Sequence, residues 1–130
     1  MLADFVSIEN LKGSNYNDTL AGSAAANAIN GFAGNDVING LAGNDTLTGG
    51  MGSDTFVFNA GSGQDTVTDF TRSADMLDFT GVAGLVSFVS FAQLSITASG
   101  GNAVVAFGVR SVTLTGVAAS SLTAGDVMFH

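Results

Sequence analysis

The sequence predicts an all-β protein: a parallel β-roll closed by a C-terminal antiparallel β meander or sandwich. Two observations lead to this class. Between residues 13 and 57, a glycine, an Asp or Asn and a large apolar residue each recur every nine residues, a period that matches neither a helix face nor an alternating strand. The second half of the chain alternates apolar and polar residues between turn signals, as antiparallel strands do.

Five repeats follow one another from residue 13 without an insertion: GSNYNDTLA, GSAAANAIN, GFAGNDVIN, GLAGNDTLT and GGMGSDTFV. Position one is always Gly, and position eight is a large apolar residue that we expect to point inward. The dipeptides Asn30-Gly31 and Asn39-Gly40 are also signals for type I′ hairpins. However, only about three residues per repeat remain for a strand, and such short strands need stacked neighbours. We therefore expect two repeats per coil, with coils about 4.8 Å apart.

The expected organisation has three parts. Residues 1–12 form a lead-in strand, residues 13–66 the roll, and residues 67–130 the β cap. A sixth turn, AGSGQD, ends the roll two residues late. In the cap, turn signals at 99–102 and 108–110 predict a three-stranded meander, and AASSLTAGD predicts a short helical turn before a last strand. A cap is required because the open end of a solenoid exposes unpaired strand edges.

Composition excludes several classes of function. With 3 Lys+Arg and a formal charge of −8, the chain is not expected to bind nucleic acid. It has no Cys, so disulfides and Cys-based zinc sites are excluded. The start MLADFVSIEN does not resemble a signal peptide, and serines and a glycine interrupt the most apolar segment, 81–94, so no membrane span is expected. The one histidine is His130, and no nucleophile has a visible His–Asp partner, so we expect no enzyme activity.

The acidic residues point to a cation. Position six is Asp or Asn in every repeat, and stacking would place these residues in two columns. Like charges about 5 Å apart repel by roughly 3 kcal/mol at an effective dielectric constant near 20. Because the available ligands are oxygens, we expect a hard cation, and flexible oxygen coordination is typical of calcium. The alternative is a metal-free solenoid in which these residues only form Asx turns, and the repulsion argues against it. The columns are Asp18, Asp36 and Asp54 on one side, and Asn27, Asp45 and Asp65 on the other.

At these residues the sequence resembles the RTX nonapeptide repeat, G-G-x-G-x-D-x-U-x. The segments GSGQDTVTDFTRSADMLDFTGV and SLTAGDVMF resemble the C-terminal targeting domains of bacterial type I secretion substrates. Similar regions occur in serralysin-type proteases, bacterial lipases, alginate epimerase modules and surface-layer proteins. The resemblance implies a secreted, extracellular protein that binds three to four calcium ions and interacts with a type I exporter during export.

The resemblance also implies the ligands. One turn supplies the carbonyls of positions two and four and the carboxylate of position six, and the facing turn supplies positions one, three and six. The first site would use Ser14, Tyr16 and Asp18 with Gly31, Ala33 and Asp36, and the second Phe32, Gly34 and Asp36 with Gly49, Met51 and Asp54. On the other side, Leu41, Gly43 and Asp45 would face Ala60, Ser62 and Asp65. A site of the second repeat with Gly40, Ala42 and Asp45 would be weak or empty, because Ala25 and Asn27 replace Gly and Asp.

Three functions are compatible with these features. The first is a calcium-dependent folding and secretion module at the C-terminus of a larger exported protein. The second is a module that binds an anionic polysaccharide, as alginate epimerase modules do, against which the negative charge argues. The third is a structural element of a surface layer, for which a flat outward ladder of Thr is missing.

Overall fold

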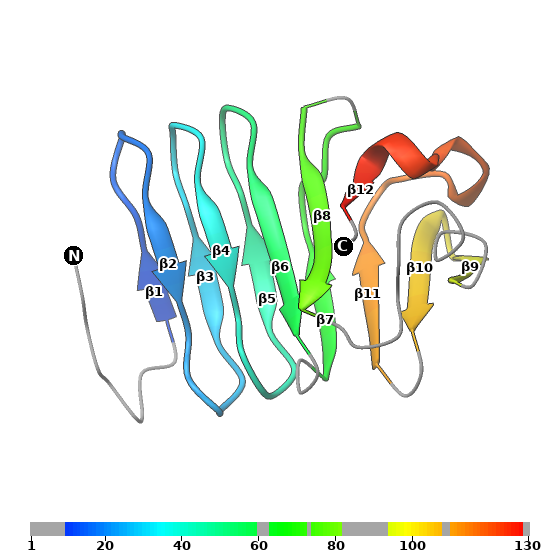
Figure 1. Ribbon diagram of the computed structural model, residues 1–130, viewed down its shortest axis with the longest axis horizontal. Helices are drawn as coiled ribbons and strands as arrows, with labels where there is room; N and C mark the ends of the chain where they lie inside the picture. The colour runs from blue at the N-terminus through cyan, green and yellow to red at the C-terminus, as the bar shows by residue number, and fades with distance from the viewer. Residues whose placement is uncertain (1–9, 60–62, 73, 82–93, 108–109, 129–130) are drawn as a thin grey trace.

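The computed structural model describes residues 10–59, 63–72, 74–81, 94–107 and 110–128 (Figure 1). The chain winds into stacked coils, with a strand on each side of every coil and a turn at each end. In Figure 1 the coils follow one another from the N-terminal end, in blue, toward the meander, in yellow and orange. Two sheets therefore face each other across a narrow core, and the all-β class with a parallel roll and antiparallel C-terminal strands is confirmed.

The five-stranded sheet is parallel throughout, in the order β12-β8-β6-β4-β2. Partners in this sheet lie 18 residues apart at first: Leu20 pairs with Ile38 and Ile38 with Phe56. The next partner of Phe56 is Leu77, 21 residues on, so one coil carries an insertion. The strands are β2 (Thr19–Ala21), β4 (Val37–Asn39), β6 (Thr55–Asn59), β8 (Met76–Gly81) and β12 (Val127–Met128).

The seven-stranded sheet has the order β1-β3-β5-β7-β11-β10-β9 and joins the roll to the meander. Its register advances by 18 residues from Leu11 to Ile29 and Leu47, and then by 20 to Val67, which matches the expected two-residue delay. The strand after β7 is β11, which pairs with it in parallel, and β10 and β9 follow antiparallel. The strands are β1 (Asn10–Lys12), β3 (Ala28–Asn30), β5 (Thr46–Thr48), β7 (Gln64–Val67), β9 (Ser95–Ser99), β10 (Asn102–Phe107) and β11 (Arg110–Leu114).

The expected turns of the C-terminal part are present where the structure describes them. The 99–102 turn connects β9 to β10, and the expected helical turn consists of two short 3₁₀ helices, η1 (Ala119–Ser121) and η2 (Ala124–Asp126). Residues 108 and 109 of the other turn lie outside the described residues. Both sheets continue past residue 66, and one hydrophobic core extends through roll and meander, so the division at 66–67 stays a prediction. No helix in the described ranges is long and apolar enough to cross a bilayer.

The core is a single layer of position-eight side chains that continues into an aromatic cluster. Ile29, Ile38, Leu47 and Phe56 are buried, as the repeat predicts. Beyond them, Phe58, Phe79 and Phe107 pack together, with ring centroids 4.6 to 6.1 Å apart. Each short strand thus contributes one inward side chain, so each of these side chains matters for stability.

We expect Ile38→Ala to destabilise the calcium-loaded protein by about 2–5 kcal/mol, because it leaves a cavity in a one-residue-thick core. Val37→Ala is the matched control, since Val37 precedes Ile38 in β4 but points outward and is 38% exposed. It should cost less than about 1 kcal/mol. Urea unfolding followed by circular dichroism measures both variants, and equal losses would contradict the assignment of inward and outward faces.

Candidate metal centre

The carboxylates of Asp36, Asp45, Asp54, Asp65 and Asp75 each bind the preceding coil through one oxygen. In each case the backbone N–H of the position-six residue in one coil donates a hydrogen bond to Oδ1 of the aspartate in the next coil. The expected stacking is therefore present. One column runs through Asp18, Asp36, Asp54 and Asp75 with distances of 2.8, 2.9 and 2.9 Å. The other runs through Asn27, Asp45 and Asp65 with distances of 2.8 and 2.9 Å.

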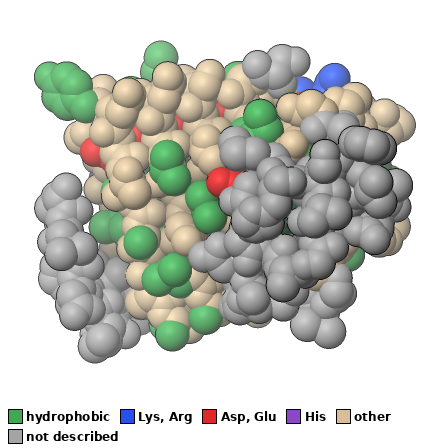
Figure 2. Space-filling model, in the orientation of Figure 1, with side chains coloured by type: hydrophobic (Ala, Val, Ile, Leu, Met, Phe, Trp, Pro, Cys, Tyr) green, Lys and Arg blue, Asp and Glu red, His purple; other side chains and the backbone are tan. Residues whose placement is uncertain are grey.

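The second oxygen of three of these carboxylates has no partner. Asp36, Asp45 and Asp54 are each 1% exposed, and no group in the described ranges donates a hydrogen bond to their Oδ2 atoms. On the face shown in Figure 2, little acidic surface is visible along the roll. Because a buried, unpartnered carboxylate oxygen is costly, it calls for a proton or a cation. The donor set fits a hard cation such as calcium.

Oxygens from successive coils converge beside the position-one glycines. A Cβ atom on Gly31 would collide with Oδ2 of Asp36 and lie 2.8 Å from the carbonyl oxygen of Gly49. On Gly13, it would lie 2.7 Å from Oδ2 of Asp18 and 2.6 Å from the carbonyl oxygen of Gly31. Carboxylate and carbonyl thus approach each other in both expected sites of this column, and only glycine leaves room for this approach.

The position-four glycines have positive φ values. Gly34, Gly43 and Gly52 have φ values of 95°, 94° and 106°, a region that glycine adopts without strain. A Cβ on Gly34 would also lie 2.7 Å from the carbonyl oxygen of Tyr16 in the previous coil. Tyr16 and Ala25 occupy position four of the two turns of the first coil and have no positive φ. The backbone conformation of these two turns therefore differs from that of the turns that contain Gly34, Gly43 and Gly52.

Position two was expected to supply only a carbonyl, but its backbone is also unusual. Phe32 and Leu41 have positive φ values of 77° and 65°, which bulky residues rarely adopt and which cost about 1–3 kcal/mol each. Gly50 occupies the same position with φ 87°. Three successive turns therefore share one conformation despite different side chains.

Two of the expected carbonyl ligands contact the facing turn. The Ser14 carbonyl accepts a hydrogen bond from the Ala33 N–H at 3.3 Å, and the Phe32 carbonyl accepts one from the Met51 N–H at 2.8 Å. A carbonyl oxygen has a second lone pair for a cation. The side chains of Tyr16 and Met51 are 79% and 76% exposed, so these residues offer the site only backbone groups.

Carboxylates alone do not complete a metal site. Across the ranges that the structure describes, no three His, Cys, Asp or Glu side chains form a metal-binding group, so carbonyls must supply most ligands. Gly40, Leu41, Ala42, Gly43 and Asp45 form one turn of the second column. Its expected partners Ala60 and Ser62 lie outside the described residues, whereas Asp65 is described and bonded to Asp45.

Burial raises the pKa of the stacked carboxyl groups. It raises the pKa of Asp45 and of Asp54 to about 6, and that of Asp65 to about 7. The pKa values of Asp36 and Asp75 also rise for this reason. Hydrogen bonds from the neighbouring coil oppose these shifts, and repulsion between neighbouring aspartates adds to those of Asp36, Asp54, Asp65 and Asp75. Without a cation, these carboxyl groups therefore take up protons at a higher pH than an exposed aspartate does.

Two aspartates of this region were not found from the sequence. Asp75 continues the first column 21 residues after Asp54, outside the 18-residue register. Asp69 accepts hydrogen bonds from the N–H groups of Gly49 at 2.9 Å and Gly50 at 2.8 Å. Both follow the irregular segment after residue 57, and the nine-residue spacing carries no signal for them.

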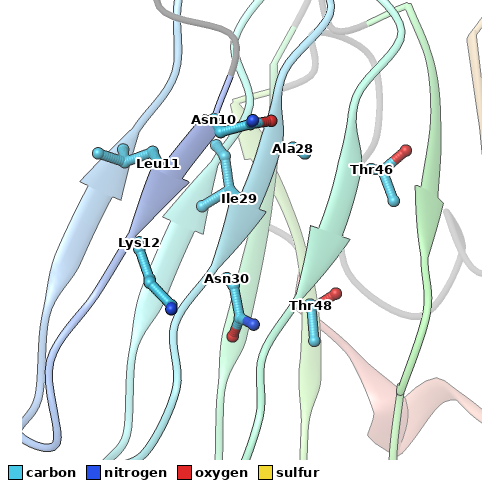
Figure 3. A pocket seen from close by; sticks show the side chains of 8 residues that line it. All are labelled: Asn10, Leu11, Lys12, Ala28, Ile29, Asn30, Thr46 and Thr48. Carbon is cyan, nitrogen blue, oxygen red and sulfur yellow. The ribbon is translucent and has the colours of Figure 1, made fainter.

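A separate groove of about 340 Å³ lies at the N-terminal end of the seven-stranded sheet (Figure 3). It is bordered by polar side chains and one lysine, Lys12, whose Nζ lies 4.6 Å from the ring centroid of Phe32. The lining residues are Asn10, Leu11, Lys12, Ala28, Ile29, Asn30, Thr46 and Thr48.

Comparisons with known proteins agree with this geometry. The family profile described as RTX calcium-binding nonapeptide repeat (4 copies) matches residues 12–47 and 30–67. No curated protein sequence matches the chain.

Solved structures share the fold. The extracellular lipase LipA from Serratia marcescens is 27% identical with a TM-score of 0.59 over 91% of this chain, which covers 20% of the lipase. The AlgE6R2 and AlgE6R3 subunits of the Azotobacter vinelandii mannuronan C5-epimerase are 28% and 26% identical, with TM-scores of 0.61 and 0.55. The alignments cover 93% and 98% of this chain and 92% and 86% of those subunits.

The matched repeats, the stacked turns and the buried carboxylates lead to one conclusion: residues 12–67 of this chain are RTX calcium-binding nonapeptide repeats.

Proposed function

We propose that this chain is a non-catalytic module that folds on extracellular calcium and carries a type I secretion signal for a larger bacterial protein. The observation that supports it most is the set of three buried Oδ2 atoms, on Asp36, Asp45 and Asp54, without a donor in the described ranges. Likeness to part of a secreted lipase and to epimerase subunits supports the role as an accessory module.

The best supported ion site lies between turns 31–36 and 49–54, which are described throughout. There the carbonyls of Phe32, Gly34, Gly49 and Met51 and the carboxylates of Asp36 and Asp54 would hold the ion. The preceding site adds Ser14, Tyr16, Asp18, Gly31 and Ala33, and the second column adds sites around Asp45 and Asp65, for three to four ions in total. When bound, calcium supplies the positive charge that the columns lack.

Calcium affinities typical of extracellular proteins are sufficient to make the folding of such a module depend on calcium. With a dissociation constant near 1 mM, in the range of extracellular modules, about 10 mM calcium adds roughly 1.4 kcal/mol per site. Three sites then add about 4 kcal/mol, a large part of a small domain's stability. Micromolar calcium adds almost nothing, so the roll would stay unfolded inside the cell and pass a narrow exporter.

The first test is folding against calcium. In chelator, circular dichroism should show a largely unfolded roll, and about 10 mM calcium should produce a cooperative change to a β spectrum. Magnesium at equal concentration should do far less, because it gives up its waters reluctantly. A full β spectrum in chelator at pH 7 would contradict the proposal.

Protons should partly replace calcium. Because the folded-state pKa values of Asp45, Asp54 and Asp65 lie near 6 to 7 and above the ordinary 3.8, the folded state binds more protons than the unfolded state between pH 4 and 7. The metal-free chain should therefore gain stability as pH falls from 7 to 5. Thermal melts in metal-free buffer measure this change.

The matched control for the proton effect is the triple variant Asp45→Asn, Asp54→Asn, Asp65→Asn, whose metal-free stability should change less with pH. In 10 mM calcium the order should reverse, since protons displace the ion and the wild-type chain should melt higher at pH 7 than at pH 5. Metal-free melting temperatures that are equal at both pH values, or higher at pH 7, would contradict the proton effect.

A second candidate function is binding of an anionic polysaccharide in the groove of Figure 3. The specific observation is a cationic residue, Lys12, among the hydrogen-bonding side chains of Asn10, Asn30, Thr46 and Thr48. The likeness to epimerase subunits supports a uronate polymer as the first ligand to test.

If the groove binds such a polymer, Lys12→Ala should weaken binding of mannuronate oligomers by roughly fivefold, about 1 kcal/mol for an exposed ion pair. Titration calorimetry in calcium measures this. Arg72→Ala is the control, because Arg72 contacts Asp126 at 3.9 Å and does not line the groove. Equal affinities of wild type and Lys12→Ala would argue against this site.

A further inference from the structure

The turns of the roll are of two kinds. In the closed kind, the second residue donates its N–H to the position-six side chain of its own turn, which occupies an oxygen of that side chain. The closed turns are 13–18 (Ser14 N–H to Asp18 Oδ2, 2.7 Å), 22–27 (Ser23 N–H to Asn27 Oδ1, 2.8 Å) and 70–75 (Thr71 N–H to Asp75 Oδ2, 2.8 Å).

In the open kind, the same N–H donates to an acceptor outside the turn. The open turns are 31–36 (Phe32 N–H to Asn30 Oδ1, 2.9 Å), 40–45 (Leu41 N–H to Asn39 Oδ1, 2.9 Å) and 49–54 (Gly50 N–H to Asp69 Oδ2, 2.8 Å). These three turns hold the unpartnered Oδ2 atoms of Asp36, Asp45 and Asp54. They are also the turns in which position two has a positive φ.

The residue before the turn accounts for the difference. Asn30 and Asn39 stand one residue before the open turns, where their side chains accept the N–H two residues on, as in an Asx turn. Lys12 and Ala21 stand there before closed turns 13–18 and 22–27, and neither side chain can accept a hydrogen bond. Asp69 stands there before the closed turn that ends at Asp75, but its carboxylate accepts the N–H groups of Gly49 and Gly50 instead. Thr48 precedes turn 49–54, and there the Gly50 N–H donates its hydrogen bond to Asp69 of the following coil.

Serine reinforces the closed form. The Ser14 hydroxyl oxygen accepts the Tyr16 N–H at 3.1 Å, and the Ser23 hydroxyl oxygen accepts the Ala25 N–H at 3.3 Å. Phe32, Leu41 and Gly50 have no such hydroxyl. In turns 13–18, 22–27, 31–36 and 40–45, the residue before the turn and the residue at position two therefore select the form of the turn.

We infer that Asn30, Asn39 and Asp69 are positioning residues that open their turns for calcium by withdrawing the position-two N–H from the buried carboxylate. This inference rests on the proposed calcium function and adds which turns bind strongly. The three open turns are the strong ones, and a position-six aspartate in a closed turn is a poorer ligand because its own turn already uses it.

The test closes one fully described turn without changing its carboxylate. Asn30→Ala with Phe32→Ser gives turn 31–36 the pattern of turn 22–27, where Ala21 and Ser23 stand. Equilibrium dialysis and titration calorimetry should show the loss of at least one calcium ion per chain, or an affinity at least tenfold lower at that site, although Asp36 is intact. Circular dichroism in saturating calcium reports whether the rest of the roll is folded.

Three controls separate positioning from general damage. Phe32→Gly removes the ring and its contact with Lys12 but keeps the backbone carbonyl and tolerates positive φ, so its calcium affinity should fall far less than that of the closed variant. Asn30→Asp keeps the accepting oxygen and should also preserve the site. Thr48→Ala alters the residue before a turn whose N–H is held by Asp69, and should leave calcium binding unchanged.

If the closed variant fails to fold, variants of turn 22–27 that should gain a calcium ion test the same inference. The background variant Ala25→Gly, Asn27→Asp restores the repeat pattern in turn 22–27 but leaves it closed, and should gain no ion. Adding Ala21→Asn and Ser23→Gly should open the turn and add one ion per chain.

The outcomes are distinguishable. Loss in the closed variant together with gain in the opened variant would support the inference. Unchanged stoichiometry and affinity in a folded closed variant, or the same gain with and without the Ala21 and Ser23 substitutions, would overturn it while leaving the calcium function intact. No calcium binding by the unaltered chain would overturn both.

Discussion

The structure depends on the burial of like-charged carboxylates in two columns. After the first coil, one oxygen of each column aspartate accepts a backbone N–H of the coil before it, so the column joins coil to coil where three-residue strands contribute little. The same burial leaves a second oxygen of Asp36, Asp45 and Asp54 without a donor in the described ranges. The aspartates thus position the coils and also require a cation or a proton, because an unpaired buried charge is costly.

Backbone strain is concentrated in the same turns. Phe32 and Leu41 adopt a conformation that favours glycine, and asparagine side chains stabilise it by accepting their N–H groups. Strain at a ligand site is held in place by the surrounding structure, here the coils on either side. The positive φ at position two and the unpartnered Oδ2 at position six therefore occur in the same turns. Both have one cause, because in these turns the position-two N–H donates its hydrogen bond outside the turn.

The two ends of the roll differ. Toward the C-terminus, β11 pairs with β7 and β12 with β8, so both sheets continue and the Phe58–Phe79–Phe107 cluster fills the core. Toward the N-terminus, Leu11 and Leu20 are only partly buried. Packing therefore contributes more at the C-terminal end, whereas the middle coils contribute one inward side chain per strand.

The sequence by itself determined the coil, its 18-residue register, the inward residues, the position-six columns and the calcium class, because each follows from a steric or charge requirement that recurs every nine residues. Only the tertiary structure decided the roles of Asp75 and Asp69, since an insertion takes them out of that register. It also decided that β11 lies beside β7 and that turns 31–36, 40–45 and 49–54 are open. These features depend on which distant segments meet and on where each N–H finds its acceptor, and a local pattern does not encode either choice.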